Sequence, residues 1–156
     1  MPVVVRGDLL QARQGIVCHQ TNCTTIGRAL GLARALFESY PYADSYRCRN
    51  AASVPGTNNY MHPPPQWRAA PIIVNMNAQR WPGKPSNPFD TPGMRLEWFE
   101  RCLIALGDWC RQRSVAEVAM PEGIGCGLAG GDWGAYRAAI ERFEAASGVA
   151  VVLFRL

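Results

Sequence analysis

The stretch VAEVAMPEGIGCGLAGGDW, residues 115–133, decides the fold class because it joins a buried strand, a glycine-rich turn and the start of a helix. Val115 to Met120 is apolar except for Glu117 and is followed by a proline, which predicts a buried strand. Five glycines follow between positions 123 and 131. Trp133 to Ala146 then carries Tyr136, Ile140 and Phe143 at helical spacing, and Gly148 marks the end of that helix.

The rest of the chain repeats this alternation of strands and helices. Strands are expected at Val3–Arg6, Gly15–His19, Pro71–Met76 and Val149–Phe154, and further helices at Ala29–Ser39 and Met94–Gln112. Two long proline-rich loops are expected at Asn50–Gln66 and Arg80–Pro92. The pattern predicts one layered α/β domain, residues 1–156, with a largely parallel central sheet.

Composition narrows the function classes. The 156 residues carry 16 basic and 12 acidic side chains, and Lys84 is the only lysine. The arginines are scattered, so a nucleic-acid groove is not expected and a small anionic ligand fits better. Six cysteines without a CxxC spacing predict no metal site, and we also expect no cofactor. With neither a signal peptide nor a membrane span in the sequence, we expect a cytoplasmic monomer.

The glycine-rich turn is a candidate phosphate site. Glycines let the backbone approach a ligand, and the N-terminus of the following helix favours an anion. Residues 125–130 also satisfy the GxGxxG pattern of Rossmann-type NAD-binding proteins. That class needs a second strand ending in an acidic residue about 20 residues further on, and the last strand carries no acid. An NAD-binding protein therefore remains the less favoured alternative.

A second strand-to-helix turn, HQTNCTTIGRALGLA at residues 19–33, also carries glycines. Two such turns can hold the two phosphates of one diphosphate, and Arg28 could pair with one of them, although a solvated loop arginine is the favoured interpretation of that residue. His19 with Cys23 could form a Cys–His hydrolase pair, but a small buried cysteine is the favoured interpretation.

These segments resemble the macro domains, a family that binds ADP-ribose. The similarity lies in GDL at 7–9, Asn22-Cys23 with GLA at 31–33, and GCGL at 125–128 through Trp133. The resemblance implies a three-layer α/β/α sandwich with a mixed, largely parallel sheet. It implies a free or macromolecule-linked ADP-ribose partner, with Asp8 on the adenine and Asn22 near the distal ribose. The ligand-binding residues it implies are Asp8, Leu9, Asn22, Gly31, Leu32, Ala33, Gly123, Ile124, Gly125, Cys126, Gly127 and Leu128.

Within this family the chain is most similar to the terminal ADP-ribose glycohydrolases and their phage and bacterial relatives. Those hydrolases carry a lysine where this sequence is interpreted to have Asn75, and an acid where it has Ala129. Their lysine-based mechanism is therefore not expected here.

We expect a hydrolase acting on an ADP-ribosyl bond or on ADP-ribose 1''-phosphate, because no second module is attached for a reader to deliver. A non-catalytic reader is the alternative. The expected mechanism is direct attack by a water held between Asn22, an acidic group and the ligand's own phosphate. Asp132 and then Asp90 are the candidate acids, although both also read as helix-cap or turn residues.

Overall fold

The structure, a computed structural model of residues 1–156, contains one six-stranded sheet in the order β1-β6-β5-β2-β4-β3. The strands are β1 Val3–Arg6, β2 Ile16–Asn22, β3 Thr57–Met61, β4 Ile72–Gln79, β5 Glu117–Pro121 and β6 Ala150–Arg155. Every neighbouring pair is parallel except β3–β4, which is antiparallel. The largely parallel sheet confirms the fold class expected from the sequence.

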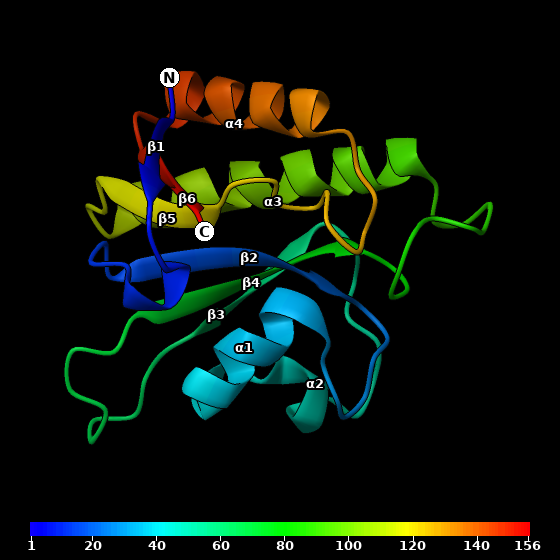
Figure 1. The fold of residues 1–156 in the computed structure, drawn as a ribbon, viewed down its shortest axis with the longest axis horizontal. Helices are drawn as coiled ribbons and strands as arrows, with labels where there is room; N and C mark the ends of the chain where they lie inside the picture. Colours follow the sequence, from blue (N-terminus) through cyan, green and yellow to red (C-terminus); the bar gives the residue numbers. More distant parts are fainter.

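Helices cover both faces of this sheet (Figure 1). The helices are α1 Gly31–Ser39, α2 Ser45–Cys48, α3 Pro92–Gln112 and α4 Trp133–Ser147, with short 3-10 turns at Leu9–Gln11 and Pro41–Ala43. α3 and α4 pack on one face, and α1 and α2 pack on the other. The three-layer α/β/α arrangement is therefore confirmed.

Each face has its own hydrophobic core. Under α3 and α4, fully buried side chains such as Leu106, Ile140 and Leu153 belong to a cluster of 22 buried residues. On the opposite face, Val17 and Ile73 pack against Leu36 of α1 in a cluster of nine. Burial of apolar area on both sides is what holds the central strands, and it leaves their ends free to carry polar groups.

Two expectations about the chain path are corrected. The expected loop Asn50–Gln66 contains β3, whose polar sequence TNNYM pairs antiparallel with β4. The edge position explains this, because an edge strand takes its hydrogen bonds from one neighbour and tolerates polar side chains. The expected strands at Gly15–His19 and Pro71–Met76 are also longer than predicted and extend to Asn22 and Gln79.

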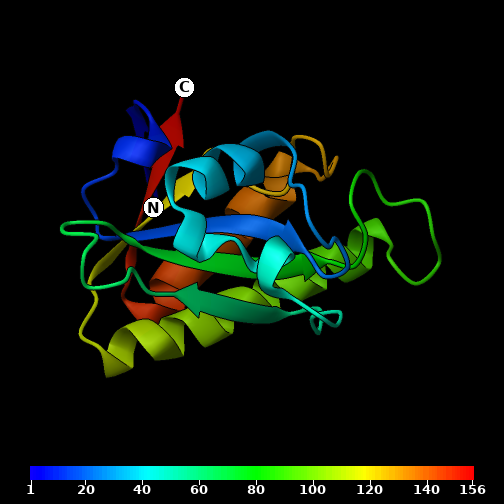
Figure 2. The same cartoon turned by 90° about the horizontal axis from the view of Figure 1, so that it is seen from below.

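The longer strands matter because β2, β4 and β5 are parallel and end at the same edge of the sheet. Three loops meet at that edge, at residues 23–30, 80–91 and 122–132. Figure 2 shows the loop at 80–91 extending past the end of the sheet between β4 and α3. None of the helices has both the length and the apolar character needed to cross a membrane.

Candidate functional site

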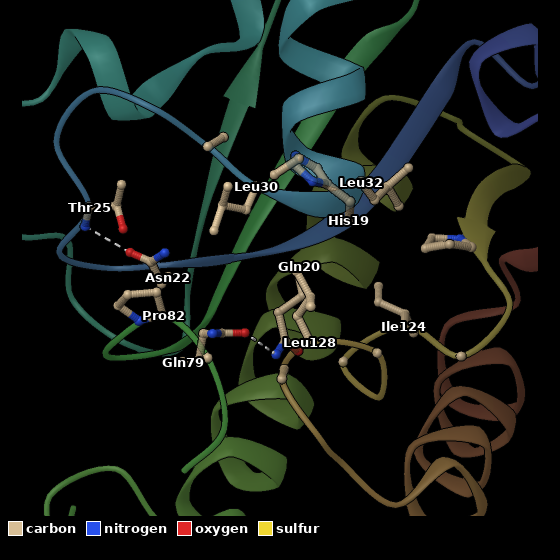
Figure 3. A pocket seen from close by; sticks show the side chains of 18 of the residues that line it. His19, Gln20, Asn22, Thr25, Leu30, Leu32, Gln79, Pro82, Ile124 and Leu128 are labelled. Atoms are coloured by element: carbon tan, nitrogen blue, oxygen red, sulfur yellow. Dashed lines mark hydrogen bonds between the residues drawn. The ribbon is translucent and has the colours of Figure 1, made fainter. Parts of the chain in front are cut away.

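A cavity of about 510 Å³ lies at the carboxyl ends of β2, β4 and β5 (Figure 3). This volume falls within the range of about 300 to 1,000 Å³ that is usual for small-molecule sites, and ligands of open parallel sheets bind at this edge. The glycine-rich loop 123–129 forms one wall and the start of α1 forms another. Asn22 and Gln79, at the ends of β2 and β4, lie at the far side from Ile124.

The glycine-rich loop presents backbone N–H groups that the protein itself does not use. The amides of Gly125, Gly127, Leu128 and Ala129 donate to no protein acceptor, whereas those of Gly130 and Gly131 close turns within the loop. Gly125 has φ +76°, and a Cβ there would lie 2.5 Å from the ring of Tyr136. The loop is therefore held in a shape that only glycine permits at this position, and a row of free amides is a typical anion site.

The N-terminus of α1 supplies a second set of free amides. Its N-cap residue Leu30 makes no side-chain cap hydrogen bond, and the first intrahelical bond runs from Arg34 N to Leu30 O. Leu32 and Ala33 of the first turn line the cavity. The uncapped N–H groups at the positive end of the helix dipole thus belong to residues that border the same cavity as the glycine loop.

The two walls approach each other closely above the cavity. A Cβ on Gly31, which has φ +59°, would lie 2.9 Å from a methyl carbon of Leu128. Leu30 and Leu128 are nonetheless about two-thirds exposed, at 67% and 65%. Two exposed leucines from opposite walls therefore flank the opening.

Asn22 has a fixed amide orientation. Its Oδ1 accepts hydrogen bonds from the backbone N–H groups of Thr24 and Thr25 at 3.1 and 2.8 Å. Since the oxygen is occupied by these two donors, the Nδ2 group is the part of the side chain that remains free. Asn22 therefore offers a donor to whatever occupies this side of the cavity.

Gln79 and Gln20 form an oriented pair on the cavity floor (Figure 3). Gln79 Nε2 donates to the carbonyl of Trp81 at 3.0 Å, so Gln79 Oε1 is free to accept from Gln20 Nε2 at 2.8 Å. The remaining oxygen, Gln20 Oε1, is buried without a hydrogen-bond donor. Both glutamines were missed in the sequence because their roles depend on side chains from neighbouring strands.

His19 is a neutral buried base beside the cavity. It is 1% exposed, and its Nε2 lies 2.5 Å from Oδ1 of Asn75. Asn75 Nδ2 donates to Ala43 O and Ser45 Oγ, which fixes its oxygen toward the imidazole. The proton is therefore on Nε2, and Nδ1 is left as an unpartnered acceptor. Burial lowers the pKa of His19 from 6.5 to about 4, opposed in part by the hydrogen bond to Asn75.

Charged groups at the cavity are few. Arg28 lines it and has no carboxylate partner. Glu122 also lines it, but both of its oxygens accept from Arg155 at 2.9 Å, and these hydrogen bonds lower the pKa of the Glu122 carboxyl. No group of three or more histidine, cysteine, aspartate or glutamate side chains is arranged to hold a metal ion.

The structure brings eight of the expected ligand-binding residues to the cavity: Asn22, Leu32, Ala33, Gly123, Ile124, Gly125, Gly127 and Leu128. Four others do not line it: Asp8, Leu9, Gly31 and Cys126. Leu9 is part of the core under α1. Asp8 is exposed after β1, and its Oδ1 accepts from the amide of Leu10 at 2.9 Å.

The two candidate acids lie outside the cavity. Asp132 is exposed and is the N-cap of α4, where its Oδ1 accepts from Gly134 N at 3.1 Å. Asp90 is 1% exposed and forms an ion pair with Arg95 at 2.7 Å. The ordinary roles of cap and buried ion-pair partner account for both carboxylates, so their positions do not support a direct part in catalysis.

The position interpreted as the lysine equivalent lies away from the cavity. Asn75 is completely buried beneath α2 and does not line the cavity. Gln79, four residues further along β4, is the side chain of this strand that reaches the cavity. The strand continues three residues past its expected end, and this extension carries Gln79 to the cavity.

The molecule is thus a three-layer α/β/α protein with a cavity at the carboxyl edge of its sheet, bordered by residues whose backbone N–H groups have no protein acceptor. Solved macrodomains share this architecture. The macrodomain of Mycobacterium tuberculosis DarG is 22% identical, with a TM-score of 0.76 over 100% of this chain and 98% of that chain. The macrodomain of Thermus aquaticus DarG is 23% identical, with a TM-score of 0.71 over 100% and 99%.

A third similar structure, Thermosipho africanus DarTG in complex with ADP-ribose, is 16% identical, with a TM-score of 0.70 over 99% of this chain and 42% of that chain. No protein-family model matches the chain, and no curated protein sequence does. The chain has the macrodomain fold.

Proposed function

We propose that the cavity binds ADP-ribose, either free or as an ADP-ribosyl group on a macromolecule. One observation carries this proposal: two independent sets of unpartnered backbone N–H groups, in the glycine loop and at the start of α1, line one cavity. A diphosphate has two anionic centres and satisfies both sets at once. Arg28 adds a guanidinium with no internal partner, and arginine suits phosphate oxygens.

The two sides of the cavity suit the two nucleoside-like ends of this ligand. Leu32, Ala33 and Pro121 give the β5 side an apolar lining that fits a purine ring. Asp8 follows β1 on that same side of the sheet and is the residue proposed to select adenine. Asn22 and Gln79 give the opposite side oriented amides that fit the hydroxyl groups of the distal ribose. The solved relative that holds ADP-ribose adds support from a shared fold.

The test is calorimetry with ADP-ribose, AMP and NAD on the parent and on Gly127→Glu. Gly127 lines the cavity, and a Cβ added to it would have no neighbouring atom within 4 Å, so the new carboxylate meets the phosphate rather than the protein. Gly93→Glu is the matched control, because Gly93 on α3 is equally unobstructed and lies outside the cavity.

We expect the parent and Gly93→Glu to bind ADP-ribose more tightly than AMP or NAD. We expect Gly127→Glu to fold but to lose this binding. Failure of the parent to bind ADP-ribose would contradict the proposal. Tighter binding of NAD than of ADP-ribose would instead favour the Rossmann-type alternative.

Hydrolysis of the bound group is the second candidate, and His19 is the observation that favours it. His19 lines the cavity and is neutral, and its Nδ1 is a buried acceptor without a donor, which makes His19 a candidate base for this reaction. Turnover of ADP-ribose 1''-phosphate and of ADP-ribosylated protein and DNA would be compared in the parent and in His19→Gln. Turnover by the parent that His19→Gln loses while keeping ADP-ribose affinity supports hydrolysis. ADP-ribose binding without turnover of any substrate would identify a reader.

A further inference from the structure

We propose that Arg95 is a positioning residue that sets the spacing between the loop at 80–91 and the glycine loop, and thereby prepares the free amides for a diphosphate. This inference rests on the proposed function. Arg95 lies in the first turns of α3 and is 2% exposed. It does not line the cavity, so any effect on the ligand is transmitted through the loops that it holds.

All five N–H groups of the Arg95 guanidinium are used. Nε and Nη2 donate to the two oxygens of Asp90 at 2.7 Å each. Nη2 also donates to Trp81 O at 3.0 Å, and Nη1 donates to Gly83 O at 2.7 Å and to Ala129 O at 3.3 Å. A buried guanidinium with every donor satisfied joins three separate backbone carbonyls in one rigid plane.

Asp90 keeps this guanidinium in place. Its Oδ2 accepts from Trp81 N at 3.0 Å as well as from Arg95, so the carboxylate is tied to the same loop. Burial alone would raise the pKa of Asp90, but the hydrogen bonds from Arg95 and from Trp81 N outweigh it and lower that pKa below its ordinary value. The ion pair therefore fixes the plane of the guanidinium, and that plane fixes where the carbonyls lie.

Two of the three carbonyls bonded to Arg95 belong to residues that line the cavity. Gly83 and Ala129 both line it, and they come from the two different loops. The amide of Ala129 is one of the unpartnered donors of the glycine loop. A second contact joins the same loops, because a Cβ on Gly130 would lie 3.0 Å from the side chain of Lys84. Moving the carbonyl of Ala129 would move the donors on either side of it.

Lysine and methionine at position 95 separate this role from a purely structural ion pair. Arg95→Lys keeps the charge that faces Asp90 but cannot reach three carbonyls in one plane. Arg95→Met removes the charge and all five hydrogen bonds. Arg101→Lys is the matched control, because Arg101 is on the same helix and makes only an exposed ion pair with Glu97.

The measurements are melting temperature, ADP-ribose affinity by calorimetry, and hydrogen exchange at the amides of Gly130 and Gly131 without ligand. These two amides bond to Gly127 O and Gly125 O within the glycine loop. We expect Arg95→Lys to melt above Arg95→Met, and to lose about tenfold or more in ADP-ribose affinity. We expect its Gly130 and Gly131 amides to exchange about tenfold faster than in the parent, and Arg101→Lys to behave as the parent.

Parental affinity and parental exchange in Arg95→Lys would overturn the inference, because the ion pair alone would then suffice. If Arg95→Met does not fold, the comparison of Arg95→Lys with the parent and with Arg101→Lys decides the matter. The exchange experiment needs no ligand. Failure of the parent to bind ADP-ribose would refute the proposed function, while unchanged exchange in Arg95→Lys would refute the role of Arg95.

Discussion

Lowering the pH from about 7 to about 5 is expected to destabilise the protein through His19. The imidazole is fully buried, and burial lowers its pKa from 6.5 to about 4 even though the hydrogen bond to Asn75 acts in the opposite direction. The folded state therefore keeps His19 neutral in this range, whereas the unfolded chain takes up a proton as the pH falls through 6.5. Because the unfolded state binds more protons, the free energy of unfolding decreases with falling pH.

The size of the effect follows from the two pKa values. Linkage between 6.5 and about 4 gives a loss of about 2 kcal/mol between pH 7 and pH 5, and the loss stops growing below the folded pKa. The acidic groups whose pKa is shifted, Glu38, Asp90 and Glu122, are shifted downward from 4.5 or 3.8. Their own contributions therefore fall mainly below this window.

The assay is urea denaturation at several pH values in the parent and in His19→Gln. Glutamine can donate to Asn75 but does not titrate. The pH dependence of the free energy of unfolding can therefore be compared between the two proteins even if their absolute stabilities differ. We expect the parent to lose about 2 kcal/mol over the window and the variant to be nearly flat. A flat parent, or the same slope in both proteins, would show that His19 is not held neutral by burial.

Two further predictions concern the loop at 123–132. Gly125→Ala should lower the free energy of unfolding by about 2 to 5 kcal/mol, since the φ of +76° disfavours a side chain and a Cβ would lie 2.5 Å from Tyr136. Gly127→Ala is the control and should change the free energy of unfolding by about 0.5 kcal/mol or less. Equal effects of the two substitutions in chemical denaturation would contradict the loop geometry. Asp132→Ala should lose about 0.5 to 2 kcal/mol of stability as a lost N-cap while ADP-ribose affinity stays parental. A large loss of ADP-ribose affinity at an unchanged melting temperature would show that Asp132 contributes to ligand binding.

Local patterns in the sequence predicted most of the fold because they are written into consecutive residues. The apolar run of β5, the five glycines and the stripe of α4 each specify their own conformation. β3 could not be predicted in this way. Its residues Thr57–Met61 include two consecutive asparagines, which are depleted in strands, and the element exists because β4 offers a free edge to pair with. Tertiary pairing outweighs local propensity there.

The residues of the candidate site likewise differ in whether the sequence alone could reveal them. The glycine loop that lines the cavity could be recognised in the sequence, because a glycine turn between a strand and a helix is specified by consecutive residues. The glutamine pair on the cavity floor could not be predicted from the sequence, because Gln20 and Gln79 acquire their orientation from each other and from the carbonyl of Trp81. Arg95 was hidden for a related reason: an arginine in a helix with charged neighbours usually faces solvent, and only the folded loops reveal five acceptors around it.

The distribution of charge around the cavity explains why those hidden residues matter. A diphosphate would meet mostly neutral backbone N–H groups, since Arg28 is the one lining cation and Glu122 is already paired with Arg155. Neutral donors attract an anion strongly only when several converge on it at hydrogen-bond distance with their direction already set. The proposed binding of a diphosphate in this cavity would therefore depend on the geometry of the glycine loop more than on net charge. That geometry is maintained from behind, by the ring of Tyr136 against Gly125 and by the guanidinium of Arg95 on the carbonyl of Ala129.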